Sequence, residues 1–143
     1  MLRVPVTTSA TLDKALDART LVIGVTINNA ARAYPFDALL KQSPIVDELG
    51  GTPLVIVLGD DHKSVRVFDR TVEARKLELL QKPNQVPLRL VDAQTASEWD
   101  FSGRALNGPL TGKQLKKIPV LNDYWFDWKT YNQNTTLYQL GNR

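Results

Sequence analysis

The alternation of apolar and polar positions predicts that the first half of the chain is built from β-hairpins. Residues 21–27 are apolar and β-branched, and residues 30–34 form a second apolar segment. Asn28 and Asn29 separate the two segments, and asparagine tolerates the positive φ angles of a type I′ turn. This pattern indicates a hairpin with a two-residue turn.

A second hairpin is predicted after a short helix. Residues 36–40 have the apolar spacing of one or two helical turns, and apolar strands then follow at 45–49 and 52–58. The pair Gly50-Gly51 between these strands adopts positive φ without a steric cost, as a tight turn requires. The second strand has no polar alternation over residues 54–58, which is typical of a central strand covered on both faces.

Further strands are predicted at residues 65–68, 77–80 and 88–91, with a turn at 59–63. Because tight turns join strands that follow one another along the chain, we expect them to pair antiparallel. The predicted fold class is therefore α+β and strand-rich, an antiparallel meander of hairpins with a few short helices.

Three other segments have helical patterns. Thr11 is a suitable N-cap for a brief helix at 11–16, and a second helix is predicted at 112–117. A third follows Asn122 or Asp123, either of which is a suitable N-cap, and it carries tryptophans three residues apart.

Large aromatic residues at this spacing usually belong to a hydrophobic core. Trp125 and Trp128 are therefore assigned to the core. The alternative is a flat platform for a sugar or a peptide, and it requires Trp128 to be exposed to solvent.

Length and composition fit one globular unit. The chain has 143 residues, of which 43% are hydrophobic and 23% are charged. A chain of this length buries roughly two thirds of its surface on folding, which is enough for one core. We expect a single domain over residues 1–143, in which residues 1–18 are a lead-in segment.

Charge and residue usage exclude several classes of function. The net charge of +3 is small, and only Lys113, Lys116 and Lys117 cluster, so we expect no nucleic-acid partner. The helix predicted at 112–117 would present these lysines as a solvated face. The chain has no cysteine and a single histidine, which excludes thiolate zinc sites and multi-histidine metal sites, and we expect no cofactor.

No apolar run reaches the roughly 20 residues that a membrane-spanning helix needs. The first five residues contain no apolar region of the kind found in a secretory signal, so none is expected in this chain.

Six residues are candidates for a binding site. Asp92, Thr95, Ser97 and Trp99 lie where a strand ends, and a carboxylate, two hydroxyls and an indole can line a polar pocket. The alternative is that Asp92 and Thr95 form an Asx-type turn, with Trp99 capping the core.

The other two candidates, Arg32 and Tyr34, alternate on one face of the strand at 30–34. Arg32 can therefore bind an anionic ligand or form a structural pair with a carboxylate such as Asp92.

Two other possibilities are less well supported by the pattern. Asp60, Asp61 and His62 can each coordinate a divalent cation, but three consecutive residues do not all point to one place, so a plain hairpin turn is favoured. Ser64 and Ser97 lack the sequence of a nucleophile elbow, and His62 is the only histidine that could serve as their base.

The order of motifs resembles the bacterial domain-of-unknown-function family 3179 (DUF3179). The resemblance extends from about residue 21 to residue 138 and consists of five motifs in one order. They are V-I-G-V with A-R-A-Y-P (residues 31–35), I-V-D with G-G (45–51), D-x-x-T-x-S-x-W (92–99), G-R-A-x-x-G-P-L-x-G-x-x-L (103–115) and W-x-x-W (125–128).

The resemblance implies a family-like core at residues 19–140 in a bacterial or archaeal protein that is often exported or membrane-tethered. It therefore implies an extracytoplasmic location, and it carries no established activity. Two departures mark a divergent member. The family's cysteine-containing stretch is replaced by residues 59–62, and a histidine-proline pair near the end reads Asn132-Gln133.

Three functions are compatible with the sequence. The leading hypothesis is a non-enzymatic domain of bacterial origin that binds another protein or a small polar ligand through the six candidate residues. The second is an enzyme, a hydrolase or transferase, with Asp92 as its base and Arg32 fixing an anion. The third is a structural subunit of a larger assembly, which predicts a large exposed apolar patch.

Overall fold

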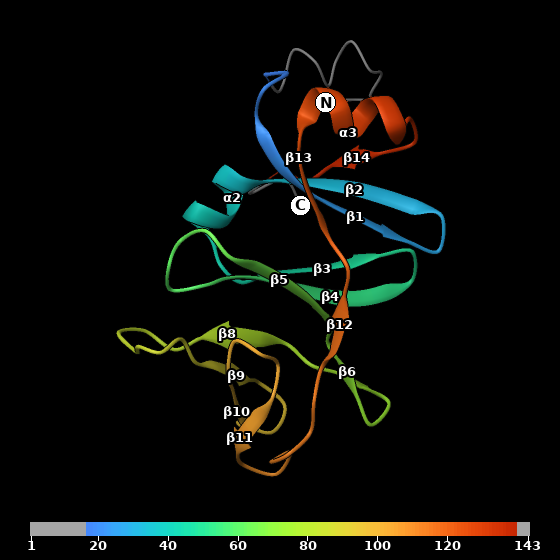
Figure 1. The fold of residues 1–143 in the computed structure, drawn as a ribbon. Coiled ribbons are helices and arrows are strands. Elements are labelled where there is room, and N and C mark those ends of the chain that lie inside the picture. Colours follow the sequence, from blue (N-terminus) through green and yellow to red (C-terminus); the bar gives the residue numbers. More distant parts are fainter. Residues whose placement is uncertain (1–16, 140–143) are drawn as a thin grey trace.

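The structure is a computed structural model that describes residues 17–139, whose strands form three four-stranded sheets and one two-stranded sheet (Figure 1). The first sheet has the strand order β13 (Leu121–Tyr124), β1 (Leu21–Ile27), β2 (Ala30–Pro35), β14 (Thr136–Leu137). The second has the order β12 (Lys116–Ile118), β5 (Val65–Asp69), β4 (Thr52–Leu58), β3 (Ile45–Leu49). The third has the order β11 (Ala105–Asn107), β10 (Glu98–Trp99), β9 (Leu90–Asp92), β8 (Leu79–Gln81). The remaining elements are the hairpin β6 (Thr71–Val72) and β7 (Arg75–Lys76) and the helices α2 (Phe36–Lys41) and α3 (Trp125–Tyr131).

The elements are stacked in layers, with α3 above the first sheet and the third sheet at the opposite end (Figure 1). One hydrophobic core lies between the first and second sheets, and another lies between the second and third sheets. A smaller cluster joins α3 to the outer face of the first sheet. The second sheet is therefore covered on both faces.

The position of strand β4 between two hydrophobic cores explains why its sequence lacks polar alternation. Leu54 and Ile56 belong to the core on one side, whereas Val55 and Val57 belong to the core on the other side. Successive side chains of a strand point to opposite faces, so a strand between two cores is apolar at every position. The prediction of a central strand covered on both faces is confirmed.

The two tryptophans of α3 pack on small residues of the first sheet. Trp125 and Trp128 lie against Ala31 and Ala33 of β2, and a Cβ atom added to Gly24 of β1 would lie 2.2 Å from the Trp128 ring. Trp128 is only 3% exposed, which confirms the core interpretation and excludes the ligand platform. The helix begins after Tyr124 without a side-chain cap.

The N-cap expected at Asn122 or Asp123 is therefore wrong, because both residues belong to β13. The backbone amides at the start of α3 are satisfied by tertiary contacts instead. The N–H of Trp125 donates to the carbonyl of Thr20 (2.8 Å), and that of Phe126 donates to the carbonyl of Ala18 (2.9 Å).

The strand-rich α+β class and both early hairpins are confirmed. Asn28 and Asn29 have φ angles of 50° and 68°, and the turn at Gly50-Gly51 also has positive φ angles. The short helix α2 follows the first hairpin as expected, and the strands predicted at 77–80 and 88–91 appear as β8 and β9, about two residues further along the chain.

The helix predicted at 112–117 is wrong. Lys116–Ile118 is strand β12, in which Lys116 pairs with Asp69 and Lys117 pairs with Phe68 of β5. The lysines consequently do not share a helical face. The long-range pairing overrides the helical spacing because it completes the edge of the second sheet.

Some pairings go beyond a meander of sequence neighbours. Strand β13 pairs with β1, and β14 lies parallel to β2. The hairpin of β6 and β7 turns at Glu73 and Ala74, which have positive φ angles although neither is a typical residue for such a turn. The helix predicted at 11–16 lies outside the described residues. No helix of residues 17–139 has the length and hydrophobicity needed to span a membrane.

Candidate functional site

Arg32 and Tyr34 both bind Asp47 on β3. An Nη1 atom of Arg32 lies 2.6 Å from Oδ2 of Asp47, and the hydroxyl of Tyr34 donates to the same oxygen at 2.7 Å. Burial alone would lower the pKa of Arg32, but the hydrogen bond and charge of Asp47 raise it. Burial and the bond to Asp47 also raise the pKa of the Tyr34 hydroxyl well above its usual value. Arg32 thus has a carboxylate partner, and that partner is Asp47 rather than Asp92.

The backbone around Asp47 is fixed by a buried arginine that the sequence analysis did not single out. Arg70 is 6% exposed, and its guanidinium donates to the carbonyls of Leu54 (2.9 Å), Leu77 (3.0 Å) and Asp47 (3.0 Å). Desolvation by burial lowers its pKa from the ordinary value. Nothing in the local sequence distinguishes Arg70 from an exposed arginine, because its partners come from three separate segments.

Asp92, Thr95, Ser97 and Trp99 form a second cluster that closes on itself. The carboxylate of Asp92 accepts hydrogen bonds from the Thr95 amide (2.5 Å), the Thr95 hydroxyl (2.9 Å) and the Trp99 indole (2.9 Å). The Thr95 and Ser97 hydroxyls lie 2.7 Å apart, and Ser97 Oγ accepts the amide of Leu110 at 3.0 Å. Asp92 is 1% exposed, so this is the geometry of a buried Asx-type turn.

The structure therefore divides the six candidate residues into two groups. Arg32 and Tyr34 lie on β2 in the first sheet, whereas Asp92, Ser97 and Trp99 lie on or beside β9 and β10 in the third sheet. The second sheet lies between these two layers (Figure 1). The six side chains do not line one common pocket.

The segment at residues 60–62 forms a hydrogen-bonded turn. Asp60 accepts the amide of Leu88 at 2.8 Å, and Asp61 accepts the amides of Lys63 (2.9 Å) and Ser64 (2.8 Å) and the Ser64 hydroxyl (2.6 Å). The hydrogen bonds from Ser64 lower the pKa of Asp61 to about 2. Over residues 17–139, no three His, Asp or Glu side chains gather as a metal site would require.

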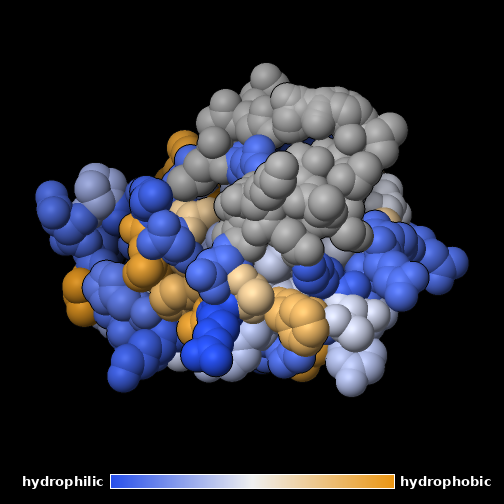
Figure 2. Space-filling view, turned by 90° about the horizontal axis from the view of Figure 1, so that it is seen from above, coloured by the Kyte–Doolittle hydropathy of each residue, from blue (hydrophilic) through white to orange (hydrophobic). Residues whose placement is uncertain are grey.

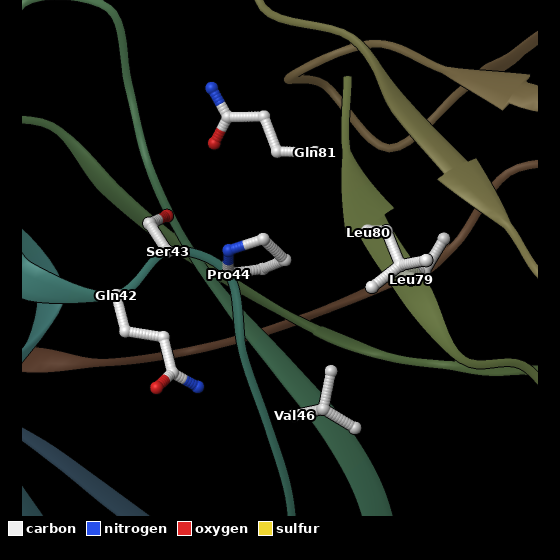
Figure 3. A pocket seen from close by; sticks show the side chains of 7 residues that line it. All are labelled: Gln42, Ser43, Pro44, Val46, Leu79, Leu80 and Gln81. Atoms are coloured by element: carbon white, nitrogen blue, oxygen red, sulfur yellow. The ribbon is translucent and has the colours of Figure 1, made fainter. Parts of the chain in front are cut away.

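A groove lies between the second and third sheets beside β3 and β8, the edge strands among the described residues, and we call it the edge groove. It has a volume of about 390 Å³. Its lining residues come from the loop after α2, from β3 and from β8 (Figure 3): Gln42, Ser43, Pro44, Val46, Leu79, Leu80 and Gln81. Both β3 and β8 are terminal strands in their sheets as far as residues 17–139 show, and Leu80 is 60% exposed.

A second pocket adjoins the edge groove. Its volume is about 230 Å³, and it shares Ser43 and Gln81 with the groove. Its remaining lining includes the exposed Leu40 and the turn at Gly59, Asp60 and His62. The two pockets therefore adjoin at Ser43 and Gln81.

Another pocket, of about 430 Å³, lies beside α3 and is lined by Arg19, Tyr124, Phe126 and neighbouring residues. The face that carries α3 is seen from above in Figure 2, where apolar residues are visible at several places among hydrophilic ones. Several exposed apolar and aromatic residues belong to β13 and α3, among them Leu121, Tyr124, Phe126 and Tyr131.

The layered sheets and short helices define a strand-rich α+β domain. The model of a family described as protein of unknown function (DUF3179) matches residues 3–135, and the chain belongs to this family. A search of curated proteins and a search of solved structures found no match.

Packing accounts for the motifs that carry the family resemblance. In A-R-A-Y-P, the alanines contact the tryptophans of W-x-x-W, while Arg32 and Tyr34 bind the aspartate of I-V-D. In G-P-L, a Cβ atom on Gly108 would lie 2.6 Å from Cα of Ser97 in D-x-x-T-x-S-x-W. These motifs therefore hold the layers together, and most of the edge groove lies outside them.

Proposed function

We propose that the chain is a binding domain that holds a segment of another protein, and that the edge groove is its site. The observation that carries this proposal is that, within residues 17–139, an edge strand from each of two sheets lines one groove, beside the exposed Leu80. Exposed sheet edges pair readily with other chains, and natural proteins usually protect them. A bound segment would bury the exposed Leu80 side chain, and burial of apolar surface favours association.

The segment at residues 59–62 supports the same location. The family resemblance places a cysteine-containing stretch at this point of the chain, and here Gly59, Asp60 and His62 line the pocket that adjoins the edge groove. The edge groove and the adjoining pocket thus combine apolar side chains with a small number of polar groups, as binding sites commonly do.

The alternative of an enzyme with Asp92 as its base has less support. The carboxylate of Asp92 is buried and is occupied by Thr95 and Trp99, and Asp92 lines none of the pockets described above. A general base needs access to the proton that it removes. Arg32 is likewise occupied by Asp47.

The alternative of a structural subunit predicts a broad exposed apolar patch, whereas the proposal of a binding domain rests on the edge groove. Bacterial origin and an extracytoplasmic location belong to this proposal as well, and both rest on the family resemblance.

The experiment compares two exposed leucines in edge strands of the same sheet. Leu80 lies in the edge groove on β8, whereas Leu106 lies on β11 at the opposite edge. Random peptides displayed on phage are selected against the chain, and the affinities of the enriched peptides are measured in solution. We expect Leu80→Asp to weaken binding about tenfold or more, since the loss of a buried leucine contact costs at least about 1.5 kcal/mol.

Leu106→Asp serves as the matched control and leaves the affinity unchanged. The proposal is wrong if no peptide is enriched, or if the two substitutions weaken binding equally.

A further inference from the structure

We propose that the segment held by the edge groove carries a lysine or an arginine, whose side chain enters the adjoining pocket and pairs with Asp60. This preference for a basic segment depends on the proposed function, because it names the kind of segment that the edge groove selects. The charge of the lining, a free oxygen of Asp60 and the apolar walls of the adjoining pocket each fit a basic side chain.

The combined lining of the edge groove and the adjoining pocket has a negative charge. Of the described residues in the two linings, Asp60 is the one that is charged when His62 is neutral. A carboxylate attracts a cationic side chain and repels an acidic one, and charge complementarity determines the choice of partner more than it determines affinity. The site therefore favours a basic segment over an acidic one.

Positive charge lies close to the groove, but on another face of the third sheet. Lys82 and Arg89 both bind Glu98, at 2.6 Å and 3.2 Å. Successive side chains of a strand point to opposite faces, so Lys82 points away from the side of Gln81, which lines the adjoining pocket. The carboxylate partner of these two cations is consequently Glu98, and Asp60 remains available.

The cations near the other side of the adjoining pocket leave Asp60 available as well. Lys41 at the end of α2 lies 3.2 Å from the carboxylate of Asp37. Lys63 is in the same turn as Asp60 but lines neither pocket. Within residues 17–139, no ion pair joins Asp60 to a cation.

The carboxylate of Asp60 is held in place while one of its oxygens is free. Its Oδ2 atom accepts the amide of Leu88 at 2.8 Å, and Leu88 is 1% exposed in the core between the second and third sheets. No hydrogen bond from the described part of the chain reaches its Oδ1 atom. A group that is already positioned loses little freedom when a partner binds. The Oδ1 atom is therefore a ready acceptor for an ammonium or guanidinium group.

The walls of the adjoining pocket suit the long stem of a basic side chain. Leucine side chains supply apolar surface beside Asp60: Leu39, Leu40 and Leu58. Lysine and arginine bury their methylene groups along apolar surface while the charged end reaches a polar environment. Ser43 and Gln81 add a hydroxyl and an amide carbonyl, which can accept the remaining N–H donors of the cation. An apolar stem with a cationic end therefore matches this pocket better than a purely apolar side chain.

One segment can occupy both pockets because they adjoin. Ser43 and Gln81 line both of them, and Figure 3 shows these two side chains at the end of the edge groove away from Val46. An apolar residue of the segment contacts Leu80 in the groove, and its basic residue passes Ser43 and Gln81 to reach Asp60. The segment thus combines an apolar side chain with a basic one.

The test begins with the peptides that phage selection enriches against the chain. We expect these peptides to share a lysine or an arginine near an apolar residue. Citrulline in place of the arginine, or acetyl-lysine in place of the lysine, keeps the length of the side chain and removes its charge. We expect this replacement to weaken binding to the wild-type chain about fivefold, as the loss of a favourable ion pair would.

The matching change in the chain is Asp60→Asn. Asparagine keeps an oxygen that can accept the amide of Leu88, so the turn is retained while the charge is lost. We expect Asp60→Asn to weaken binding of the basic peptide about fivefold and to leave binding of the uncharged peptide unchanged. The two substitutions together form a double-mutant cycle, which isolates the contribution of the pair.

Asp61→Asn is the matched control. Asp61 is adjacent to Asp60 and carries the same charge, but it lines neither pocket, and its carboxylate accepts the amide and the hydroxyl of Ser64. Salt screens the attraction between exposed charges that are not in contact. We therefore expect Asp61→Asn to weaken binding of the basic peptide by less than about twofold.

The outcomes separate the basic preference from the proposed function. If Leu80→Asp weakens binding but the enriched peptides share no basic residue, the edge groove is a binding site and the pair with Asp60 is wrong. Equal losses for Asp60→Asn and Asp61→Asn would show attraction by the whole turn, and they would also overturn the pair. If no peptide is enriched, both proposals fail. If the free chain forms a dimer that Asp60→Asn dissociates, the partner is a second copy of the chain, and the assignment to a different protein is overturned.

Discussion

Replacement of Asp92 by asparagine tests whether the cluster at Asp92 stabilises the fold. The substitution replaces one carboxylate oxygen with an NH₂ group, which cannot accept a hydrogen bond. In one orientation of the amide this group faces the indole N–H of Trp99, and in the other it faces the backbone N–H of Thr95. One hydrogen bond to a charged acceptor is lost, at a cost of about 1.5–3 kcal/mol. Asparagine is neutral and recovers part of the cost of burying a charge. We therefore expect a loss of about 2 kcal/mol in the free energy of unfolding.

Asp61 provides a matched control. Its carboxylate also accepts hydrogen bonds from the amide and the hydroxyl of the residue three positions along the chain, which is Ser64. This turn is exposed, however, whereas Asp92 is 1% exposed. Water replaces much of the lost hydrogen bonding at the surface, so we expect Asp61→Asn to cost clearly less stability than Asp92→Asn.

The assay is urea unfolding at pH 7. With a denaturant dependence of about 2 kcal/mol per molar, the predicted loss lowers the midpoint for Asp92→Asn by about 1 M urea without changing the slope. Equal shifts in the Asp92 and Asp61 variants would refute the reasoning, since burial would then have no effect. A midpoint shift below about 0.3 M for Asp92→Asn would refute the predicted loss in the free energy of unfolding.

Two further predictions concern the first sheet. Tyr34→Phe removes the hydrogen bond to Asp47 and should cost about 1.5–3 kcal/mol in urea unfolding at pH 7. The pKa of Tyr34 is raised in the folded state, so the hydroxyl contributes fully to the free energy of unfolding below about pH 10 and contributes less above it. The difference in stability between Tyr34→Phe and the wild type should therefore narrow above about pH 10. A difference that does not change with pH would contradict this. Gly24→Ala places a methyl group against Trp128 and should cost about 1–3 kcal/mol. Trp128→Phe in the same chain makes room for the methyl, so the double variant should lose less than the sum of the two single variants, and additive losses would disprove the contact.

Local chemistry made several elements predictable. Asn28-Asn29 and Gly50-Gly51 tolerate the positive φ angles that they adopt, so both hairpins follow from a few residues. The apolar run in β4 and the spacing of Trp125 and Trp128 likewise report burial directly, because side-chain periodicity depends only on the local backbone.

The candidate site was less accessible to sequence reasoning. The alternation of Arg32 and Tyr34 correctly indicated one face, but their partner Asp47 lies on another strand and has no local signature. Arg70 was missed because its three carbonyl partners are dispersed along the chain. The edge groove was missed because residues 42–46 and 79–81 meet only when two sheets stack.

The sequence by itself determined the strand-rich class, the early hairpins, the tryptophan-bearing helix and the family. The tertiary structure alone decided that Lys116–Ile118 is a strand, that Arg32 binds Asp47, and that β3 and β8 face one groove. The physical reason is distance along the chain. Turn geometry and side-chain periodicity arise within a few residues, whereas sheet edges, ion pairs and grooves depend on which remote segments pack together.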